Sequence, residues 1–511
     1  MLIRREPLQS TAQAGTVSRR TSPAIDDQAD DLPGLLVNDA QSQLNPTRVQ
    51  RIDRPKTLED IQRTLRDARR QGKAVSLSGG RHSMGGQQFG QETILLDMRQ
   101  FNRVIKFDSI KGHIEVQGGI QWPELIEYLH REQQGRRTAW AIRQKQTGVD
   151  SVTVAGSLAS NIHGRGLQFP PIIGDVESFV LVDALGKVHT CSRRENAELF
   201  ALAIGGYGLF GIIAQVTLRL VPRTKLERVV EVIAVRDLLP KVATRLQQGF
   251  VYGDCQYCTD LESDAESHAG VFSCNRPVDL ITPMPQQPKQ LTTEDWANFY
   301  LLARTNKKKA FEKYSQYYLS TSGQVYWSDT HQMASAFKGY REVVDKTRGT
   351  EMITEVYVTE DAFLPFLAQV RQDFVEHNVD MTYGTIRFIE QDTESFLAWA
   401  QQRFVCIVCN LHVVHTKAGK KKAATDFRRI IDRAIQFGGR YFLTYHRWAT
   451  RQQVETCYPQ FVEFLRLKKK YDPQERFQSD WYRHYKTMFA DELSRNRVTT
   501  QRTIRREGRC R

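Results

Sequence analysis

Residues 78–86 read SGGRHSMGG, a nine-residue stretch in which four glycines accompany an arginine and a histidine. Apolar segments flank it on both sides, AVSL at 74–77 and ETILLDM at 92–98. Each glycine inside a helix costs about 1 kcal/mol relative to alanine, so the pattern predicts a loop. Glycine is used where backbone N–H groups come close to a ligand or where φ is positive. The stretch therefore predicts a loop that cradles a phosphate.

Two further stretches of small residues adjoin predicted strands. TVAGSLASNIHGRG spans residues 153–166, and we expect it as a second loop; GGYGLFGII spans 205–213 and leads into a strand. The opening loop has neither the dinucleotide pattern G-x-G-x-x-G nor the phosphate-binding pattern G-K-[ST]. Several such loops together predict a long ligand with a diphosphate in its middle. The alternative is that these glycines form ordinary hairpin turns.

The composition is 40% apolar and 10% aromatic over 511 residues, which predicts a substantial core and two or three domains. No apolar run approaches the roughly 20 residues that span a bilayer, and the N-terminus lacks the apolar segment of a secretory signal. The eight cysteines are scattered, with Cys406 and Cys409 on the apolar run FVCIVCNLHVVH. We expect buried, reduced thiols in a cytoplasmic protein, with no metal centre and no disulfide framework.

The formal net charge of +14 allows binding to nucleic acid or to an anionic membrane. The excess is partly local, because basic residues gather in the tail 494–511 and in the short runs 306–313 and 417–429. Solvated helix faces and a disordered tail explain such runs, so no nucleic-acid partner is expected.

Hydrophobic periodicity predicts an α+β fold in two parts. A helix begins after the N-cap Thr57 and ends at Gly72, a second helix carries Pro123 in its first turn, and Gly186 lies in a hairpin turn. We expect a disordered extension over 1–40, a compact α+β domain over 41–222, and a substrate domain over 223–430. That second domain has an antiparallel sheet with flanking helices. C-terminal helices over 431–490 pack back near the first domain, and a basic disordered tail covers 491–511.

These motifs together resemble the FAD-binding domain of the vanillyl-alcohol oxidase / para-cresol methylhydroxylase superfamily. The nearest branch holds the aldonolactone oxidases, alditol oxidase and decaprenylphosphoryl-ribose oxidase. VSLSGGRHSMGG at 75–86 is similar to the first flavin-diphosphate loop of the family, and GVDSVTVAGSLASNIHG at 148–164 to the loop that lines the flavin ring. Residues 178–222 resemble the adenine-side strands, and 458–481 resemble the C-terminal helices of the branch.

The resemblance implies FAD as the cofactor and assigns residues to it. His82 matches the histidine that alditol-oxidase-like members link covalently to the 8α carbon of the flavin; the alternative is a histidine that only hydrogen-bonds within the loop. The implied FAD-binding residues are Ser78, Gly79, Gly80, Arg81, His82, Ser83, Met84, Thr153, Ala155, Gly156, Ser157, Ser160, Asn161, Ile162 and Ile213.

The resemblance also implies catalytic residues in the second part of the chain. Arg387 matches the arginine of a Glu-x-Arg pair, but Thr385 stands where the family has the glutamate. His412 matches a histidine near substrate, and Tyr445, followed by His446, stands where the branch has a catalytic lysine. We expect His446 or His412 to accept the hydroxyl proton, Tyr445 to orient it and Arg387 to polarise the oxygen. Each has a structural alternative: a core histidine, a packed tyrosine, or an arginine paired with a carboxylate.

The expected function is FAD-dependent oxidation of a CH–OH group in a sugar, aldonolactone or polyol-like small molecule. Oxygen or another acceptor would then reoxidise the flavin. Two alternatives stay open: a flavin-dependent reductase of the sterol-side-chain type, and a non-catalytic basic binding protein on a flavin fold. The sequence leaves the substrate, the electron acceptor and the oligomeric state undecided.

Overall fold

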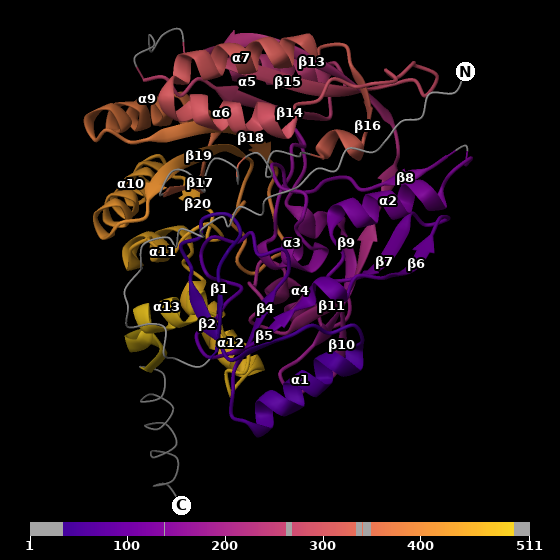
Figure 1. The fold of residues 1–511 in the computed structure, drawn as a ribbon, viewed down its shortest axis with the longest axis vertical. Coiled ribbons are helices and arrows are strands. Elements are labelled where there is room, and N and C mark those ends of the chain that lie inside the picture. The colour runs from indigo at the N-terminus through magenta and orange to yellow at the C-terminus, as the bar shows by residue number, and fades with distance from the viewer. Residues whose placement is uncertain (1–33, 137, 262–267, 334–339, 341–348, 495–511) are drawn as a thin grey trace, which may run out of the picture.

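The computed structural model describes residues 34–136, 138–261, 268–333, 340 and 349–494. Figure 1 shows an N-terminal part at the bottom and an eight-stranded sheet at the top, with the C-terminal helices running back down beside the N-terminal part. The largest cluster of buried apolar side chains includes residues of both parts. The chain therefore forms an α+β protein whose two parts share one core.

A small parallel sheet carries the glycine-rich loop. Its strand order is β3 (Arg51–Asp53), β5 (Ile94–Asp97) and β4 (Val75–Ser78), and helix α1 (Leu58–Arg70) makes the crossover from β3 to β4. Thr57 and Asp60 form a capping box at the start of α1, as the sequence predicts. The loop begins where β4 ends, so the sheet fixes its first residue.

A five-stranded antiparallel sheet supports the other side of the N-terminal part. Its strand order is β10 (Val188–Ser192), β9 (Val176–Val182), β11 (Ile212–Arg219), β7 (His113–Gln117) and β6 (Val104–Asp108). Gly186 has φ +84° in the predicted hairpin turn between β9 and β10. Short pairs β1–β2 (Leu35–Val37, Thr47–Val49) and β8–β12 (Trp140–Ala141, Val221–Pro222), with helices α2 (Trp122–Glu132) and α4 (Ala197–Ala203), complete this part.

The second glycine-containing stretch is a helix and not the loop that the sequence predicts. Helix α3 covers Val154–Ser160, with the Thr153 hydroxyl accepting the N–H of Gly156 at its start. Asn161 ends it in the left-handed conformation at φ +49°. The cap at each end outweighs the weak helix propensity of serine and glycine in seven residues.

The second part is one antiparallel sheet of eight strands. The order is β16 (Val325–Trp327), β13 (Lys225–Ala234), β15 (Ala269–Val278), β14 (Tyr252–Tyr257), β18 (Met381–Ile389), β19 (Phe404–Val414), β17 (Gly349–Val358) and β20 (Arg440–Tyr441). Helices α9 (Glu360–Glu376) and α10 (Lys417–Gln436) pack on β17 and β19. Helices α5 (Leu238–Gln247), α6 (Thr293–Thr305) and α7 (Lys307–Ser320) cover the β13–β15 end (Figure 1).

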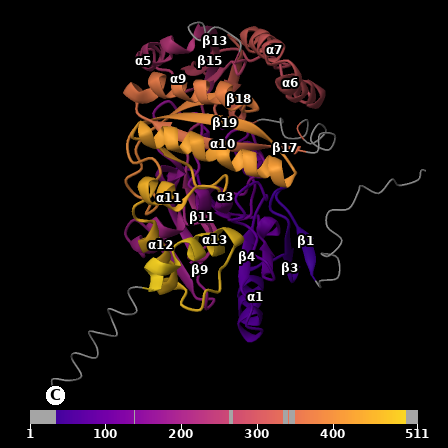
Figure 2. The ribbon, with the colours of Figure 1, turned by 90° about the vertical axis from the view of Figure 1, so that its left-hand side faces the viewer.

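The C-terminal segment returns to the N-terminal part, as Figure 2 shows for α11 (Arg451–Cys457), α12 (Phe461–Tyr471) and α13 (Asp480–Met488). The N–H of Val75 on β4 donates to Arg476 O at 2.7 Å, and the N–H of Gln478 donates to Val75 O at 3.0 Å. The last helices are therefore tied to the strand that launches the glycine-rich loop.

The seven cysteines among the described residues are buried and free of disulfide bonds, in agreement with the sequence prediction. Cys406 and Cys409 lie three apart on β19, where such residues face opposite sides of the sheet. In the described part of the chain, no helix is both long and apolar enough to cross a membrane.

Candidate active site

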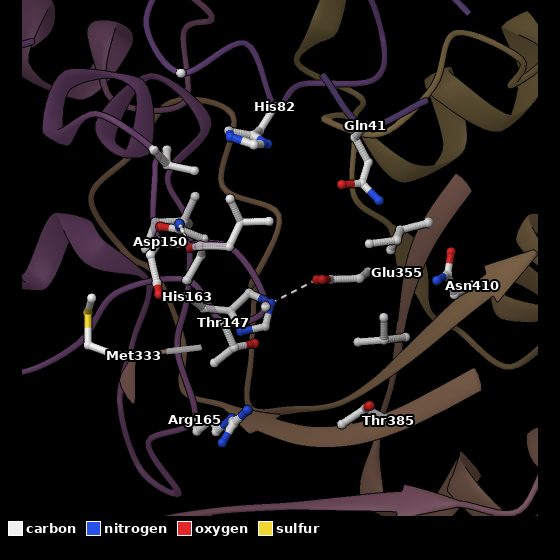
Figure 3. A pocket seen from close by; sticks show the side chains of 18 of the residues that line it. Gln41, His82, Thr147, Asp150, His163, Arg165, Met333, Glu355, Thr385 and Asn410 are labelled. Carbon is white, nitrogen blue, oxygen red and sulfur yellow. Dashed lines mark hydrogen bonds and ion pairs between the residues drawn. The ribbon is translucent and has the colours of Figure 1, made fainter. Parts of the chain in front are cut away.

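A cavity of about 780 Å³ lies between the two parts of the protein. One wall is the glycine-rich loop with the segments around α3 and before β11; the other is a face of the eight-stranded sheet. Figure 3 shows side chains of both walls, with His163 and Glu355 pointing toward each other across the space. A single cavity therefore joins the two sets of residues that the sequence singles out.

The glycine-rich loop forms a cradle with no room for side chains. A Cβ atom at Gly79 would lie 2.1 Å from Thr153 Oγ1, and one at Gly80 would lie 2.0 Å from Ser151 O. Both glycines line the cavity, as does Ser78, whose buried hydroxyl has no hydrogen-bond partner in the described part of the chain. Bare backbone and a free hydroxyl suit a ligand with phosphate oxygens. The residues therefore fit the diphosphate of FAD.

Most of the side chains that the resemblance assigns to FAD line this cavity. They are Ser78, Gly79, Gly80, Arg81, His82, Ser83, Met84, Thr153, Ala155, Gly156, Ser160, Ile162 and Ile213. Ser157 and Asn161 do not line it. The Ser157 hydroxyl accepts from Trp122 Nε1 at 3.0 Å, and the Asn161 amide donates to Asp392 at 2.8 Å. The structure therefore places both side chains away from the cavity, since they face inward from α3 and hold it against its neighbours.

The sheet wall is built from cross-strand rows. Glu355 of β17 is paired with Val408 of β19, which is paired with Thr385 of β18, and all three line the cavity. The next row along these strands brings Arg387 onto the same face. Thr385 thus stands at the position of the missing glutamate of the family, while a carboxylate two strands away projects into the same cavity.

Glu355 is the centre of a buried hydrogen-bond network. Its carboxylate accepts from His163 Nε2 at 2.8 Å, from the Tyr445 hydroxyl at 2.6 Å and from the Tyr357 hydroxyl at 3.0 Å. The side chains of His163 and Glu355 are each 3% exposed. A buried carboxylate with three such donors is held in one orientation.

Both ring nitrogens of His163 face acceptor atoms. Nε2 lies 2.8 Å from the Glu355 carboxylate, and Nδ1 lies 3.1 Å from the carbonyl oxygen of Gly164. Burial raises the pKa of Glu355, but the charge and hydrogen bond of His163, with Arg387 and the Tyr445 hydroxyl, outweigh it and hold the pKa at about 2. Glu355 is therefore ionised at neutral pH.

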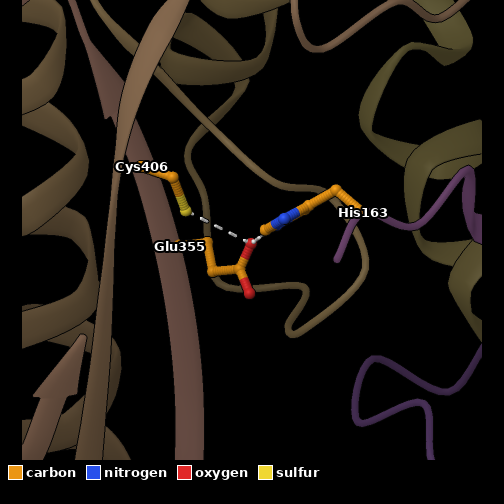
Figure 4. Close-up of side chains that lie close together, drawn as sticks. All are labelled: His163, Glu355 and Cys406. Atoms are coloured by element: carbon orange, nitrogen blue, oxygen red, sulfur yellow. Dashed lines mark hydrogen bonds and ion pairs between the residues drawn. The ribbon is translucent and has the colours of Figure 1, made fainter. Parts of the chain in front are cut away.

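Cys406 completes a group with the spacing of metal ligands (Figure 4). Each of His163, Glu355 and Cys406 offers one possible ligand atom, and these three atoms lie within 4.8 Å of one another. Burial raises the pKa of Cys406 well above its usual range, so the neutral thiol donates toward Glu355 at 3.7 Å. We assign the group as a hydrogen-bond network.

Among the described residues, the polar atoms of the sheet wall that have no hydrogen-bond partner include two that could serve a substrate. They are Arg387 Nε, a donor, and Asn410 Oδ1, an acceptor, and both residues line the cavity. Native proteins rarely leave buried polar atoms unpaired without a ligand or water to satisfy them. This part of the cavity therefore offers a donor and an acceptor to a polar substrate, beside the Tyr445 hydroxyl.

The two histidines predicted to take a proton do not line the cavity. His446 is 1% exposed, packs against Phe427 of α10 with ring centroids 4.7 Å apart and contacts Thr354 Oγ1 at 3.3 Å. Thr354 points to the helix-covered face of β17, opposite Glu355. Burial lowers the pKa of His446 to about 3. This placement contradicts a direct catalytic role and favours the alternative of a core histidine.

His412 lies one row beyond Asn410 on β19, opposite Glu351 of β17. Its Nδ1 bonds Glu351 Oε1 at 2.9 Å, and its side chain is 3% exposed. A Cβ at Gly349 would come within 2.5 Å of its Nε2. Enclosed in this way, His412 cannot contact a substrate in the cavity, so the structure corrects its assignment as well.

Two cavity-lining residues that the sequence analysis did not single out are His163 and Glu355. His163 lies near the end of the stretch 153–166 and was given no role there. Glu355 lies in EMITEVYVT at 351–359, which reads as a strand. The signal that was available is an acidic side chain within an apolar strand, since burying a charge requires a partner.

Comparison with known proteins finds similarities that cover part of each wall. A family model described as FAD binding domain matches residues 49–192, and one described as D-arabinono-1,4-lactone oxidase matches residues 361–485. L-gulonolactone oxidase of Bos taurus is 28% identical over 38% of this chain and 42% of its own length. D-arabinono-1,4-lactone oxidase of Debaryomyces hansenii is 29% identical over 37% of this chain and 35% of its own.

A longer and weaker match is L-gulono-1,4-lactone dehydrogenase of Mycobacterium tuberculosis, 24% identical over 84% of this chain and 95% of that protein. By contrast, the matches to the Bos taurus and Debaryomyces hansenii enzymes span less than half the length of those relatives.

Proposed function

This chain combines an FAD binding domain with a D-arabinono-1,4-lactone oxidase domain, and on that premise we propose that it oxidises a CH–OH group of a sugar lactone or polyol-like substrate. When bound, FAD supplies the hydride acceptor, and oxygen or another acceptor then takes the electrons. The observation that supports this proposal best is the cavity itself. It places the glycine cradle of the first domain opposite Tyr445, Arg387 and Glu355 of the second.

Tyr445 is the side chain that we assign to the substrate hydroxyl. Burial and the charge of Glu355 raise its pKa well above the usual range, so Tyr445 stays a neutral phenol whose O–H donates to Glu355 Oε1. Its oxygen lone pairs are left to accept from a substrate O–H. Arg387 Nε donates to the same substrate oxygen or to a neighbouring one, and so positions the reacting carbon.

The hydroxyl proton of the substrate follows this series of hydrogen bonds as the substrate C–H bond breaks. It moves from the substrate oxygen to Tyr445 Oη, while the Tyr445 hydrogen moves to Glu355 Oε1. A carboxylate with a pKa of about 2 is a weak base. The carboxylate is still basic enough to take the proton. If the substrate oxygen kept its proton as hydride left, the product would be a protonated carbonyl, which is a far stronger acid than a carboxylic acid. His163, held by Gly164 O, keeps Glu355 in place and ionised before the reaction.

We further propose that His82 forms a covalent bond to the flavin. Burial lowers its pKa to about 4, so the imidazole is neutral and nucleophilic at pH 7, and Ser151 Oγ orients its Nε2 at 2.9 Å. The new C–N bond replaces one C–H bond of the ring methyl group and the imidazole N–H. The two hydrogens and two electrons remain on the flavin until the electron acceptor of turnover removes them.

The decisive experiment is anaerobic mixing of the purified yellow protein with a panel of aldonolactones, polyols and phosphorylated sugars. Loss of flavin absorbance with at least one member, followed by recovery when oxygen or an artificial acceptor is added, is the expected result. A protein that holds FAD but is reduced by no CH–OH compound, and is bleached instead by NADPH, would contradict oxidation as its function.

The covalent bond has its own measurement. Acid precipitation should leave the flavin with the wild-type polypeptide and release it from His82→Ala, with Ser83→Ala as the matched control in the same loop. Release of all the colour from the wild-type protein would disprove the bond without affecting the proposed reaction.

A further inference from the structure

The cavity extends beyond the sheet wall into a space bounded by the helical hairpin α6–α7. We call this space the aromatic chamber; Trp296, Phe299, Tyr300, Phe311, Tyr314 and Tyr318 of the hairpin line it. Figure 1 shows the hairpin beside β14 and β18. Strand β18 carries Thr385 and Arg387. The chamber and the candidate active site are therefore parts of one continuous space.

Ring contacts join these side chains into one surface across the two helices. Trp296 and Phe299 of α6 have centroids 6.1 Å apart, Phe299 and Tyr314 also 6.1 Å, and Tyr314 stacks on Tyr318 of α7 at 4.3 Å. Such offset and edge-on pairs fix the rings relative to one another. The surface is therefore preorganised before any ligand arrives.

The described residues leave the aromatic surface only partly covered. Helix α6 has no buried residue, although it carries Trp296, Phe299 and Tyr300, each of which is half-buried. Soluble proteins seldom leave a contiguous apolar surface of this kind without a ligand or partner. Because it faces a cavity rather than open solvent, a ligand inside the cavity is the occupant that fits it.

Two arginines lie near the rings. Arg165 forms an ion pair with Asp254 at 3.1 Å, and Arg228 stacks over Tyr326 at 4.5 Å from the ring centroid. Their Nε atoms have no hydrogen-bond partner among the described residues, and the same holds for Arg387 Nε and Asn410 Oδ1 on the sheet wall. A group rich in hydroxyls finds its partners at these polar atoms, and an apolar group finds its contacts on the rings of the chamber.

We propose that the substrate carries an apolar substituent, aromatic or alkyl, which binds in the aromatic chamber while its CH–OH group lies at Tyr445 and Arg387. This inference rests on the proposed function and specifies its substrate class. It separates this chain from an enzyme for a small, unsubstituted sugar lactone, for which the chamber would have no use.

The test measures equilibrium binding to the FAD-loaded protein, which requires no turnover. A series of glucosides with methyl, butyl, hexyl and octyl groups, and a phenyl glucoside, is titrated while the flavin spectrum and Tyr/Trp fluorescence are followed. We expect each buried CH₂ to tighten Kd about two- to fourfold, the change that its transfer from water supplies. A Kd that is flat along the series would overturn the proposal.

Two variants of α6 locate the binding. Ala303 lines the cavity, whereas Ala297 on the same helix does not. Ala303→Trp should weaken octyl glucoside at least tenfold and leave methyl glucoside unchanged, and Ala297→Trp should match the wild type. Equal losses in both variants would also overturn the proposal.

The same titrations distinguish the two levels of the hypothesis. Chain-length-dependent binding without flavin reduction by any alcohol supports the chamber and refutes the oxidation. Reduction by short polyols together with a flat series supports the oxidation and refutes the chamber.

Discussion

Tyr445 is the residue on which the proposed proton path depends, because its hydroxyl both faces the cavity and donates to Glu355. In Tyr445→Phe the substrate hydroxyl loses its partner while the ring still fills the same space. We expect the rate constant of flavin reduction to fall about 100-fold, within the range of general acid–base effects, with flavin content unchanged. Stopped-flow absorbance under anaerobic conditions measures this rate.

His446 supplies the control for that measurement. Since it faces α10 and not the cavity, His446→Gln should leave the reduction rate within about threefold of the wild type, which is too small for a general acid–base role. If His446→Gln were slowed as much as Tyr445→Phe, the proton path assigned to Tyr445 would be wrong.

The ionised side chain of Glu355 also contributes to the free energy of unfolding. Its pKa is lower in the folded protein than in the unfolded chain, so its contribution to stability is full above the unfolded pKa and disappears as the pH falls toward 2. A shift of this size corresponds to roughly 3 kcal/mol. We expect Glu355→Gln to lower the free energy of unfolding strongly at pH 7, less than half as much near pH 3, and little near pH 2.

Urea denaturation at several pH values measures that difference. Glu376, whose side chain is 63% exposed, provides the control: Glu376→Gln should show no pH-dependent loss. A gap between wild type and Glu355→Gln that widened as the pH fell would contradict the ionised state of Glu355.

At the scale of elements, the loop after β4 is tested by adding one carbon atom. The Cβ of Gly80→Ala would meet Ser151 O at 2.0 Å and the His82 ring at 3.1 Å, so the loop must move away from the segment that precedes α3. We expect flavin content after purification to fall at least tenfold, with folding retained, as measured by absorbance and circular dichroism. Ser83→Ala adds no atom and should retain its flavin; normal flavin in Gly80→Ala would disprove the close packing of the cradle.

Elements with one buried face were predictable from sequence. Helix α1 has apolar residues at helical spacing and a capping box, and β11 alternates buried and half-buried residues up to Arg219. Both patterns arise because one face packs on the core while the other meets solvent. The glycine-rich loop was predictable for a different reason, because each glycine disfavours a helix.

Elements that lack one buried face and one exposed face could not be predicted from the sequence. Strand β17 is buried on both faces, so its residues show no alternation and Glu355 does not stand out as facing a cavity. Helix α6 has no buried residue and gave no pattern, although its aromatic side chains line the cavity. His446 was assigned from its neighbour Tyr445, but the two lie in the turn that follows β20, where Tyr445 lines the cavity and His446 packs on Phe427.

At the scale of the whole molecule, the cavity is assembled from parts of the chain that are far apart in sequence. Ser78 and Tyr445 both line it, and the backbone of 476–478 pairs with Val75 of β4. The largest apolar cluster also contains side chains from both domains. We therefore expect the domains to unfold together, as one cooperative unit that FAD stabilises.

The size of that stabilisation tests the expectation. His82→Ala should bind FAD reversibly, and at 100 times Kd the ligand adds about 2.7 kcal/mol to the folded state. With an unfolding entropy of about 2.1 cal/mol/K per residue, this raises Tm by about 3 °C if the 511-residue chain melts as one unit. If only the FAD-binding domain melted, the smaller entropy change would give about 7 °C, because the same free energy is divided by fewer residues. Calorimetry of His82→Ala with and without FAD should therefore show one transition and the smaller shift, whereas two transitions with only the first responding to FAD would show that the domains are thermally independent.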